Sequence, residues 1–307
     1  MVNYSDWLKD IDSDTYISKL SLPGTHNSAA CHAALPSVRC QDHSVSSQLQ
    51  HGVRFFDIRL GKLFFNKNED GKYDSNELQV IHGKFPVRIP FPLKFSSVLQ
   101  EFYDFLDQHP GETVVVSLKQ EGEDSWDNDN DEFGKFFWNN YIHRDNSAFE
   151  KYWYLKNEVP RLGDARGKII LFRRFGTREQ DYGNEYGINA AWWSYNTTSE
   201  DRGAFQVQDY CEINGTDDIV QKASYVKSLM KSASEFNSTN PGSSKLFINF
   251  CSGSNFFNKD CWPEKISEKI RQCGLEEEIR KGCGVVIIDY AGSDDWRLVE
   301  RIVSSNF

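Results

Sequence analysis

The sequence contains no long hydrophobic run. Its longest unbroken aliphatic stretch spans residues 285–288, whereas a helix that crosses a bilayer needs about 20 apolar residues. We therefore expect no transmembrane segment. Basic residues are also few, because 35 Lys and Arg stand against 45 Asp and Glu, a net charge of −10 with histidine neutral. Such a chain is a poor general binder of nucleic acid, and its overall charge does not draw it to an anionic membrane.

Two further features are missing from the sequence. A secretory signal needs an apolar stretch of about 7–15 residues, and the first 20 residues contain none. An intracellular location is therefore favoured over secretion. No CxxC pair occurs among the seven cysteines, so no zinc site is expected. We predict reduced thiols rather than disulfides, because a chain of 307 residues can build its core without covalent cross-links.

What the sequence does contain is a regular alternation of β-rich runs and helical stretches. Helices are predicted at residues 95–109, 219–236 and 264–272. The strands are short and nearly continuous in Val, Ile, Leu and Phe, as strands covered on both faces should be. They are predicted at residues 18–22, 53–60, 79–82, 113–118, 168–172, 205–209, 245–250 and 284–289. This pattern predicts a single α/β domain over residues 1–307, built as a parallel (β/α)8 barrel of the TIM type.

Two polar loops interrupt this alternation, at residues 66–77 and 121–131. The first is rich in Asn, Asp, Lys and Gly, and the second is strongly acidic. We predict that both are solvated surface excursions. A calcium loop is the alternative for the second, but it lacks the glycine and the final glutamate of an EF-hand loop.

Charged and imidazole side chains occur where several predicted strands end. His26 follows the first strand, His82 ends the third and Asp289 ends the last. Asp57 and Arg59 lie two apart in the second strand and should therefore face the same side. In parallel barrels the side chains at the carboxyl ends of the strands meet around one site. We expect these five residues to converge.

The combination of residue types suits cleavage of a phosphodiester. Two histidines can take and give protons near neutral pH. An arginine can hold phosphate oxygens bidentately, and an aspartate beside a histidine can set its tautomer. Taken singly, each residue also fits a structural role, such as a hydrogen-bonding turn, an ion pair within a strand or a helix cap. The combination favours metal-free phosphodiester chemistry.

Five segments of the chain carry a family resemblance. They are LPGTHNS at residues 22–28, GVRFFDIR at 52–59, VIHG at 80–83, VSLK at 116–119 and DARGK at 164–168. In this order they resemble the X domain of phosphatidylinositol-specific phospholipase C, in its small single-domain bacterial form, over residues of about 18–290. The resemblance implies a distorted (β/α)8 barrel. It also implies cleavage of phosphatidylinositol to diacylglycerol and inositol 1,2-cyclic phosphate, with slower opening of the cyclic ester to inositol 1-phosphate.

The same resemblance implies roles for individual residues. His26 would be the general base toward the inositol 2-hydroxyl, and His82 the general acid toward the leaving oxygen. Arg59 would hold the phosphate, Asp289 would bind His26, and Asp57 would orient Arg59 or His82. The positions that match contacts to the inositol ring are Lys119, Arg174, Asp209 and Tyr210, with Cys211 as the alternative to Tyr210.

Three residues decide whether a metal is expected. Calcium-dependent relatives carry an asparagine after the first histidine, as Asn27 does here, and acidic residues at both positions that match Asp57 and Arg59. Because Arg59 puts a cation where calcium would lie, we predict that no cofactor and no metal are required, with calcium as the disfavoured alternative. Asn27 departs from the metal-independent bacterial pattern, which usually has aspartate there, and a lower turnover is the expected consequence.

Membrane contact should be local and aromatic. The candidate segments are Phe64-Phe65, the loop at residues 85–95, Trp192-Trp193 and Phe256-Phe257. We favour residues 84–94, which combine Lys84, Arg88 and Lys94 with aromatic rings beside His82. The expected partner is phosphatidylinositol at a membrane surface, met by transient peripheral contact. Two alternatives remain: a catalytically weak or inactive module that binds lipid or inositol phosphate, and a metal-dependent barrel enzyme similar to a glycerophosphodiesterase.

Overall fold

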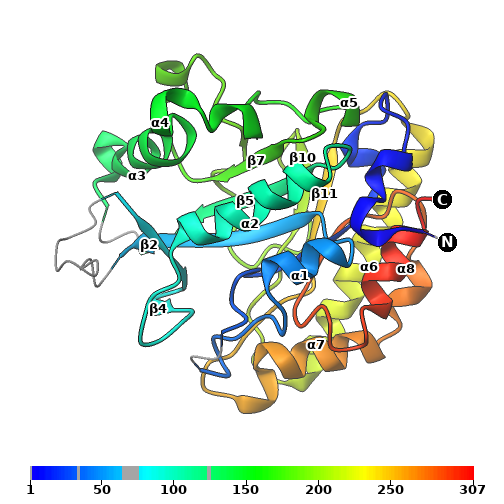
Figure 1. The fold of residues 1–307 in the computed structure, drawn as a ribbon. Coiled ribbons are helices and arrows are strands. Elements are labelled where there is room, and N and C mark those ends of the chain that lie inside the picture. The colour runs from blue at the N-terminus through cyan, green and yellow to red at the C-terminus, as the bar shows by residue number, and fades with distance from the viewer. Residues whose placement is uncertain (1, 33–34, 64–75, 123–125) are drawn as a thin grey trace.

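The computed structural model describes residues 2–32, 35–63, 76–122 and 126–307 of the chain. Its strands join into one curled sheet (Figure 1). The strands are β1 (Ser21–Thr25), β2 (Phe55–Lys62), β3 (Leu78–His82), β4 (Phe85–Pro86), β5 (Val114–Gln120), β6 (Trp153–Tyr154), β7 (Ile169–Arg174), β8 (Ile188–Asn189), β9 (Glu200–Asp201), β10 (Phe205–Gln208), β11 (Leu246–Phe250) and β12 (Gly284–Ile288). The α-helices are α1 (Val45–Gln50), α2 (Phe95–Gln108), α3 (Glu132–Phe137), α4 (Arg144–Ser147), α5 (Leu162–Ala165), α6 (Thr216–Thr239), α7 (Pro263–Gln272) and α8 (Arg297–Ser304).

The sheet is a parallel barrel that is open on one side. Its order is β6-β7-β5-β2-β1-β12-β11-β10-β9, and every neighbouring pair from β6 to β10 is parallel. β8 also pairs with β7 in parallel, whereas β9 is antiparallel to β10. Within the described part of the chain no pairing joins β8 to β9 or β10. The predicted distorted α/β barrel of the TIM type is confirmed.

Two of the predicted strands differ from the prediction. β3 is not a barrel strand, because it pairs antiparallel with β2 and with β4 and so forms a hairpin. A parallel return needs a crossover of about a dozen residues or more, usually a helix, and the polar residues 66–77 have no helical pattern. β1 begins at Ser21 rather than at residue 18, because Ile17–Lys19 form a 3-10 turn.

The strands bury both of their faces, with a period of two residues. Phe55, Val115 and Ile170 belong to one buried cluster, and their neighbours Phe56, Val116 and Ile169 belong to the other. The first cluster fills the barrel, since the rings of Phe55 and Phe172 meet across β5 at a centroid distance of 5.9 Å. The second cluster lies between the sheet and the helices. This alternation decides which side chains reach the site.

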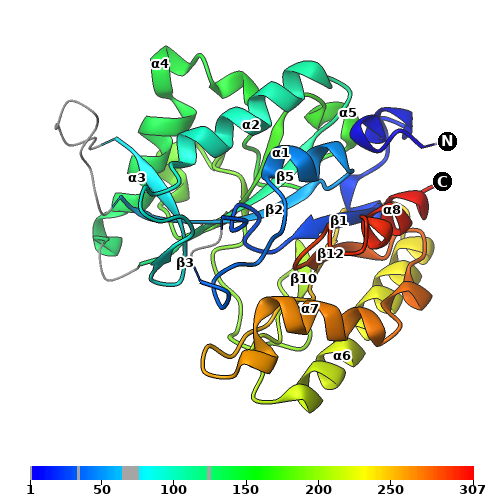
Figure 2. The ribbon, with the colours of Figure 1, turned by 60° about the horizontal axis from the view of Figure 1, so that its bottom comes forward.

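Helices α1, α2, α3, α6, α7 and α8 pack on the outer face of the curled sheet, because each contributes buried side chains to the second cluster. Figures 1 and 2 show α6, α7 and α8 together at one end, α3 and α4 at the other, and the two termini close to each other. Among the described residues, no helix has the length and apolar character that crossing a bilayer requires. All seven cysteines are free thiols.

Candidate active site

The site residues continue the inward-facing rows of the barrel strands beyond their apolar part. On β2 the row runs from Phe55 to Asp57 and Arg59, and on β5 it runs from Val115 to Lys119. The other rows end at His26 after β1, Arg174 on β7, Asp209 after β10 and Asp289 after β12. Because all these strands are parallel, their rows end at the same mouth of the barrel. The predicted convergence of the polar residues is observed.

An open cavity lies at this mouth, with a volume of about 500 Å³. Its polar wall includes six side chains that the sequence already singled out, namely His26, Arg59, His82, Lys119, Arg174 and Asp209, together with Glu212, Ser252 and Ser254. Its other wall is aromatic and comes from Trp192, Trp193 and Tyr195, which follow β8. A ligand with an anionic centre and a ring that carries hydroxyl groups would fit such a lining.

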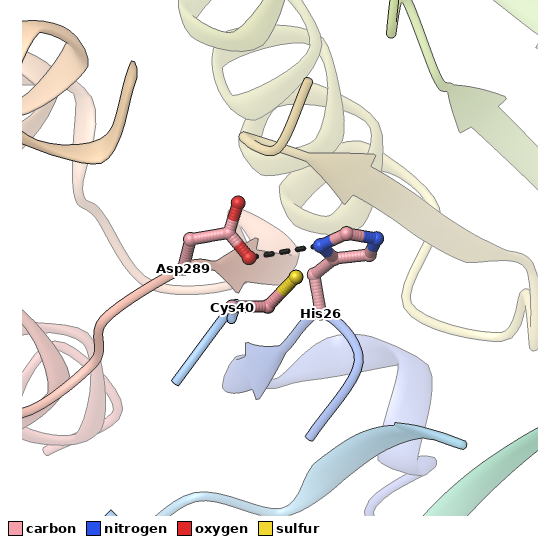
Figure 3. Close-up of side chains that lie close together, drawn as sticks. All are labelled: His26, Cys40 and Asp289. Carbon is pink, nitrogen blue, oxygen red and sulfur yellow. Dashed lines mark hydrogen bonds and ion pairs between the residues drawn. The ribbon is translucent and has the colours of Figure 1, made fainter. Parts of the chain in front are cut away.

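His26 is held between a carboxylate and a guanidinium. Its Nδ1 lies 2.8 Å from Asp289 Oδ1 (Figure 3), and its Nε2 lies 2.8 Å from Arg59 Nη2. A guanidinium can only donate, so Nε2 is the acceptor and the ring proton is on Nδ1, toward Asp289. This is the tautomer that a general base needs when Nε2 faces the substrate. Burial raises the pKa of the Asp289 carboxyl against the opposing effect of His26.

Arg59 is the central cation of the cavity. Its Nε donates to Asp57 Oδ2 at 3.3 Å, and its Nη1 donates to Glu121 Oε1 at 3.3 Å. Burial disfavours the charged form, but these two carboxylates outweigh it and raise the pKa of the Arg59 guanidinium above its ordinary value. Arg59 is therefore a fixed positive charge next to His26.

Asp57 joins Arg59 to a second cation. It is fully buried, and its Oδ1 accepts from Arg174 Nη1 at 3.2 Å. Burial opposes its ionisation, but Arg59 and Arg174 outweigh that effect and hold the pKa of the Asp57 carboxyl well below its ordinary value. Of the two orientations implied by the family resemblance, the described contacts fit Arg59 as the partner of Asp57 rather than His82.

His82 reaches the site from the β2–β3 hairpin. Because β3 runs antiparallel to β2, its last residue returns toward the mouth of the barrel. Its Nδ1 lies 3.0 Å from the Val38 carbonyl oxygen, which can only accept, so Nε2 is the nitrogen left for a substrate. The rings of His26 and His82 are perpendicular, with centroids 5.9 Å apart. Burial, and then Arg59 and His26, lower the pKa of His82 to about 4.

Three further residues surround the space beside Arg59. Lys119 Nζ donates to Glu121 Oε1 at 2.9 Å, and Trp193 Nε1 donates to Asp209 Oδ2 at 3.1 Å. The Arg174 guanidinium lies 3.9 Å from the centroid of the Trp193 ring. Burial, followed by the neighbouring guanidiniums, lowers the pKa of Lys119. These side chains offer both donors and acceptors to a hydroxylated ring.

Tyr210 does not line the cavity. Its ring packs against Tyr225 of α6, at a centroid distance of 5.3 Å, and Cys211 lines the cavity in its place. The reason is the period of the strand, since Phe205 and Val207 point into the barrel and residue 210 continues the other row. The aromatic ring expected from Tyr210 is supplied by Trp193 and Tyr195, which the prediction of a sugar contact did not include.

Glu121 belongs to the charged group around Arg59, and it was not predicted from the sequence. It was predicted to lie in a solvated acidic loop, but only 13% of its side chain is exposed and it binds both Arg59 and Lys119. The loop prediction is also wrong for Asp131, which is buried and accepts from Thr177. For Glu121, the sequence offered one signal, namely its position two residues after Lys119 and directly after the end of β5. Residues 64–75 and 123–125, and with them Phe64-Phe65, lie outside the described residues.

Asn27 does not reach Arg59 through its side chain. It has a φ of 43°, a conformation that asparagine tolerates better than most residues. Its backbone N–H donates to Asp57 Oδ2 at 3.3 Å. Its buried amide faces the Cys40 thiol and makes no hydrogen bond of normal geometry within the described chain. The carboxylates that bind Arg59 are therefore Asp57 and Glu121.

One cluster has donor types that metals bind. The donor atoms of His26, Cys40 and Asp289 all lie within 4.8 Å of one another (Figure 3). The imidazole and the carboxylate already share a hydrogen bond, and burial raises the pKa of the Cys40 thiol well above its ordinary value. A thiolate ligand is thereby disfavoured, and Arg59 adds a positive charge next to the group.

Known proteins resemble this chain over nearly its whole length. It is 26% identical to the 1-phosphatidylinositol phosphodiesterase of Staphylococcus aureus strain Newman, with 98% of this chain and 94% of that protein aligned. It is 24% identical to the protein of the same name from Listeria monocytogenes serovar 1/2a, with 99% and 86% aligned.

The fold is also similar to solved structures. A double mutant of the phosphatidylinositol-specific phospholipase C from Staphylococcus aureus superposes with a TM-score of 0.77, at 23% identity over 99% of this chain and 97% of that chain. The phosphatidylinositol-specific phospholipase C from Listeria monocytogenes superposes with a TM-score of 0.68, at 21% identity over 100% of both chains. The family described as phosphatidylinositol-specific phospholipase C, X domain, matches residues 19–175, just over half of the sequence, and the chain belongs to this family.

Proposed function

We propose that the protein cleaves phosphatidylinositol to diacylglycerol and inositol 1,2-cyclic phosphate by acid–base catalysis. The observation that carries this proposal is the pair of perpendicular histidines beside Arg59, whose Nη2 lies 2.8 Å from His26 Nε2. A phosphate bound by Arg59 would have one imidazole near the attacking oxygen and the other near the leaving oxygen. The curated relatives carry the name of this activity.

In the first step the inositol 2-hydroxyl attacks the phosphorus. A phosphate oxygen is a stronger acceptor than an imidazole nitrogen, so Arg59 turns to the phosphate and leaves His26 Nε2 free. Nε2 takes the hydroxyl proton while the new oxygen–phosphorus bond forms. The bond from phosphorus to the glycerol oxygen breaks, its electron pair stays on that oxygen, and protonated His82 supplies the proton. Asp289 stabilises the imidazolium that forms at His26.

In the second step the roles of the histidines reverse. His82 is now neutral and takes a proton from water, whose oxygen attacks the phosphorus of the cyclic ester. The bond from phosphorus to O2 breaks, and His26 returns the proton that it took. The product is inositol 1-phosphate, and both imidazoles return to their starting states.

The inositol ring is proposed to lie against the side chains beyond Arg59. Lys119 and Arg174 can donate to ring hydroxyls, Asp209 can accept, and Trp193 offers an apolar face. Each of these groups already has a polar or aromatic partner within the described structure, so their geometry is set before a ligand arrives. Because Lys119 is already paired with Glu121, and Arg174 with Asp57, the set suits an unphosphorylated ring.

His82 should titrate well below an ordinary histidine. Burial, Arg59 and His26 lower its pKa to about 4 in the free protein, against an ordinary value of about 6.5. A bound phosphate diester adds a negative charge and raises the pKa of His82, which favours the protonated acid only when substrate is present. Titration of the His82 ring protons by NMR should give a midpoint near 4 and a higher one in Arg59→Ala. A midpoint near 6.5 in the wild-type protein would contradict this electrostatic account.

We also propose that the reaction needs no metal ion. Asp57 and Glu121 are the carboxylates closest to Arg59, and the guanidinium of Arg59 binds both of them. A divalent cation at that position would be repelled by Arg59 and would lack free oxygen ligands.

Release of diacylglycerol from phosphatidylinositol micelles should therefore proceed at the same rate, within about twofold, in excess EDTA and in added calcium. This assay also tests the proposed function itself. Complete loss in EDTA that calcium restores would favour the metal-dependent alternative. Binding of phosphatidylinositol without any product in either condition would favour an inactive binding module.

Membrane contact is proposed to occur through an aromatic rim beside His82. The rim consists of Phe85, Ile89, Phe91, Phe256 and Phe257, all of them exposed large hydrophobic residues. It joins two of the segments that the sequence suggested, because the rings of Phe85 and Phe256 stack at a centroid distance of 5.8 Å. Clustered exposed aromatic rings next to a lipid-cleaving site are the type of surface that enters a membrane interface.

Phe91→Ala is expected to weaken binding to phosphatidylinositol vesicles by about tenfold, since its ring is 76% exposed and would lose its burial in the interface. Sedimentation with sucrose-loaded vesicles measures the effect. Phe307→Ala is the matched control, because it removes another exposed ring, 59% exposed, at the C-terminus. Equal binding of the two variants would move the contact away from residues 84–94.

A further inference from the structure

A second cavity opens beside the first one and shares two of its residues. It has a volume of about 260 Å³, and His82 and Ser254 line both cavities. Its apolar wall consists of Val38, Phe85, Phe256 and Trp262. The proposed mechanism assigns the polar cavity to the phosphate and the inositol ring, and leaves this smaller cavity without a role.

We infer that the smaller cavity is a subsite for the leaving group, and that it takes the glycerol backbone and the first acyl carbons of diacylglycerol. This inference rests on the proposed function, in which His82 protonates the glycerol oxygen. An atom within hydrogen-bond reach of His82 lies where the two cavities meet. When the phosphate is bound at Arg59, the diacylglycerol attached to the glycerol oxygen must extend away from the inositol ring.

The chemistry of the walls fits this occupant. His82 and Lys84 are the ionisable side chains among its lining residues, and Ser37, Ser254 and Asn255 are the neutral polar ones, so the cavity lacks the cluster of cations that a phosphorylated ring would need. Cavities that enclose a whole small ligand typically have a volume of about 300–1,000 Å³, and this cavity is smaller. It therefore has room for the start of the lipid and not for two complete acyl chains.

The position of the cavity fits a lipid that stays in the membrane. Phe85 and Phe256, which line it, also belong to the aromatic rim through their stacked rings. Phe257 contacts Phe256 at a centroid distance of 5.4 Å and is 96% exposed. The apolar surface thus runs without interruption from the rim to His82, and the remaining acyl carbons can stay in the interface.

Trp262 gives the cavity a fixed inner wall. Its indole Nε1 donates to the Phe256 backbone oxygen at 3.0 Å, which ties the start of α7 to the loop that carries Phe256. On the opposite side, the Val38 carbonyl oxygen accepts from the His82 ring. Val38 therefore both lines the cavity and orients the acid His82.

The test distinguishes an effect of this cavity from an effect on membrane binding and from an effect on the catalytic residues. Its probes are dihexanoyl phosphatidylinositol below its micellar concentration, which has a leaving group but no interface, and inositol 1,2-cyclic phosphate, which has no leaving lipid. The measured quantity is the ratio of kcat/KM for the first probe to that for the second. Phe256→Ala and Phe85→Ala should each lower this ratio about fivefold to tenfold, the scale of a lost apolar contact in a pocket. The control Phe307→Ala should leave the ratio unchanged.

An unchanged ratio in both rim variants would overturn the leaving-group subsite, even though the wild-type protein cleaves both probes. If the wild-type protein cleaves neither probe, the proposed function itself is wrong, and the two failures are distinguishable. Both rings are partly exposed, at 43% for Phe85 and 46% for Phe256, so their removal opens no cavity in the core. A thermal melt of each variant checks that the fold is retained.

Discussion

Replacement of His26 with alanine is expected to lower kcat for phosphatidylinositol cleavage on the order of 10⁴-fold. In the proposed mechanism His26 alone takes the proton of the attacking hydroxyl. The orientation of its ring depends on Asp289 at Nδ1 and Arg59 at Nε2, both at 2.8 Å. Alanine removes the base and leaves the phosphate-binding guanidinium in place, so substrate binding should change much less than turnover. Steady-state kinetics on monomeric dihexanoyl phosphatidylinositol separates kcat from KM without a membrane term.

His143→Ala is the matched control for that experiment. His143 begins the α4 region, contacts Ser147, and lies outside the lining of the described cavity. Its removal should change kcat by less than about twofold, as expected for a surface substitution. If His26→Ala kept more than a hundredth of wild-type turnover, His26 would not be the base, and another group within reach of the cavity would have to be sought.

Replacement of Arg59 is expected to lower activity by a comparable factor. The loss would come from weaker stabilisation of the phosphate rather than from a lost proton transfer. Arg59→Ala should lower kcat/KM by about 10³–10⁵-fold, the range found when an arginine that stabilises phosphoryl transfer is removed. Arg59→Lys should lower it by about 10²–10³-fold, because the ammonium keeps the charge but loses the planar pair of donors. Both effects should appear with monomeric substrate.

Stability measurements distinguish a catalytic loss at Arg59 from an unfolded site. Asp57 is fully buried and would lose one of its two guanidinium partners in Arg59→Ala, so that variant should also unfold at lower denaturant concentration. Arg59→Lys should stay close to wild type in stability while it loses activity. Arg161→Lys serves as a control, since Arg161 stacks on Tyr16 and lies outside the described active-site cavity. Full activity in Arg59→Lys would contradict the bidentate role.

The sequence predicted the barrel and its mouth because both depend on a local period. Buried strands with two apolar faces are recognisable from their composition, and the carboxyl ends of parallel strands must meet. Asp57, Arg59 and Asp289 therefore lie together as predicted, although more than two hundred residues separate Arg59 from Asp289. The strand period also accounts for the departure of Tyr210, because an even-numbered residue after Phe205 and Val207 belongs to the outer row.

The features that were not predicted depend on contacts between distant loops. Glu121 resembles any other acidic loop residue in sequence, and only the tertiary structure brings it to Arg59 and Lys119. The antiparallel course of β3 was also missed, since a short apolar run does not reveal the direction in which it pairs. The stacking of Phe85 on Phe256 joins segments about 170 residues apart. No periodic pattern carries information of that kind.

The central claim is that an inositol hydroxyl, activated at this pair of histidines, attacks the phosphorus. Phosphorus NMR of the purified protein with phosphatidylinositol in detergent micelles and excess EDTA tests it most directly. The account predicts a resonance of a five-membered cyclic phosphodiester that appears first and converts slowly to a phosphomonoester. Direct formation of the monoester without the cyclic ester, or formation of products only after calcium is added, would contradict it.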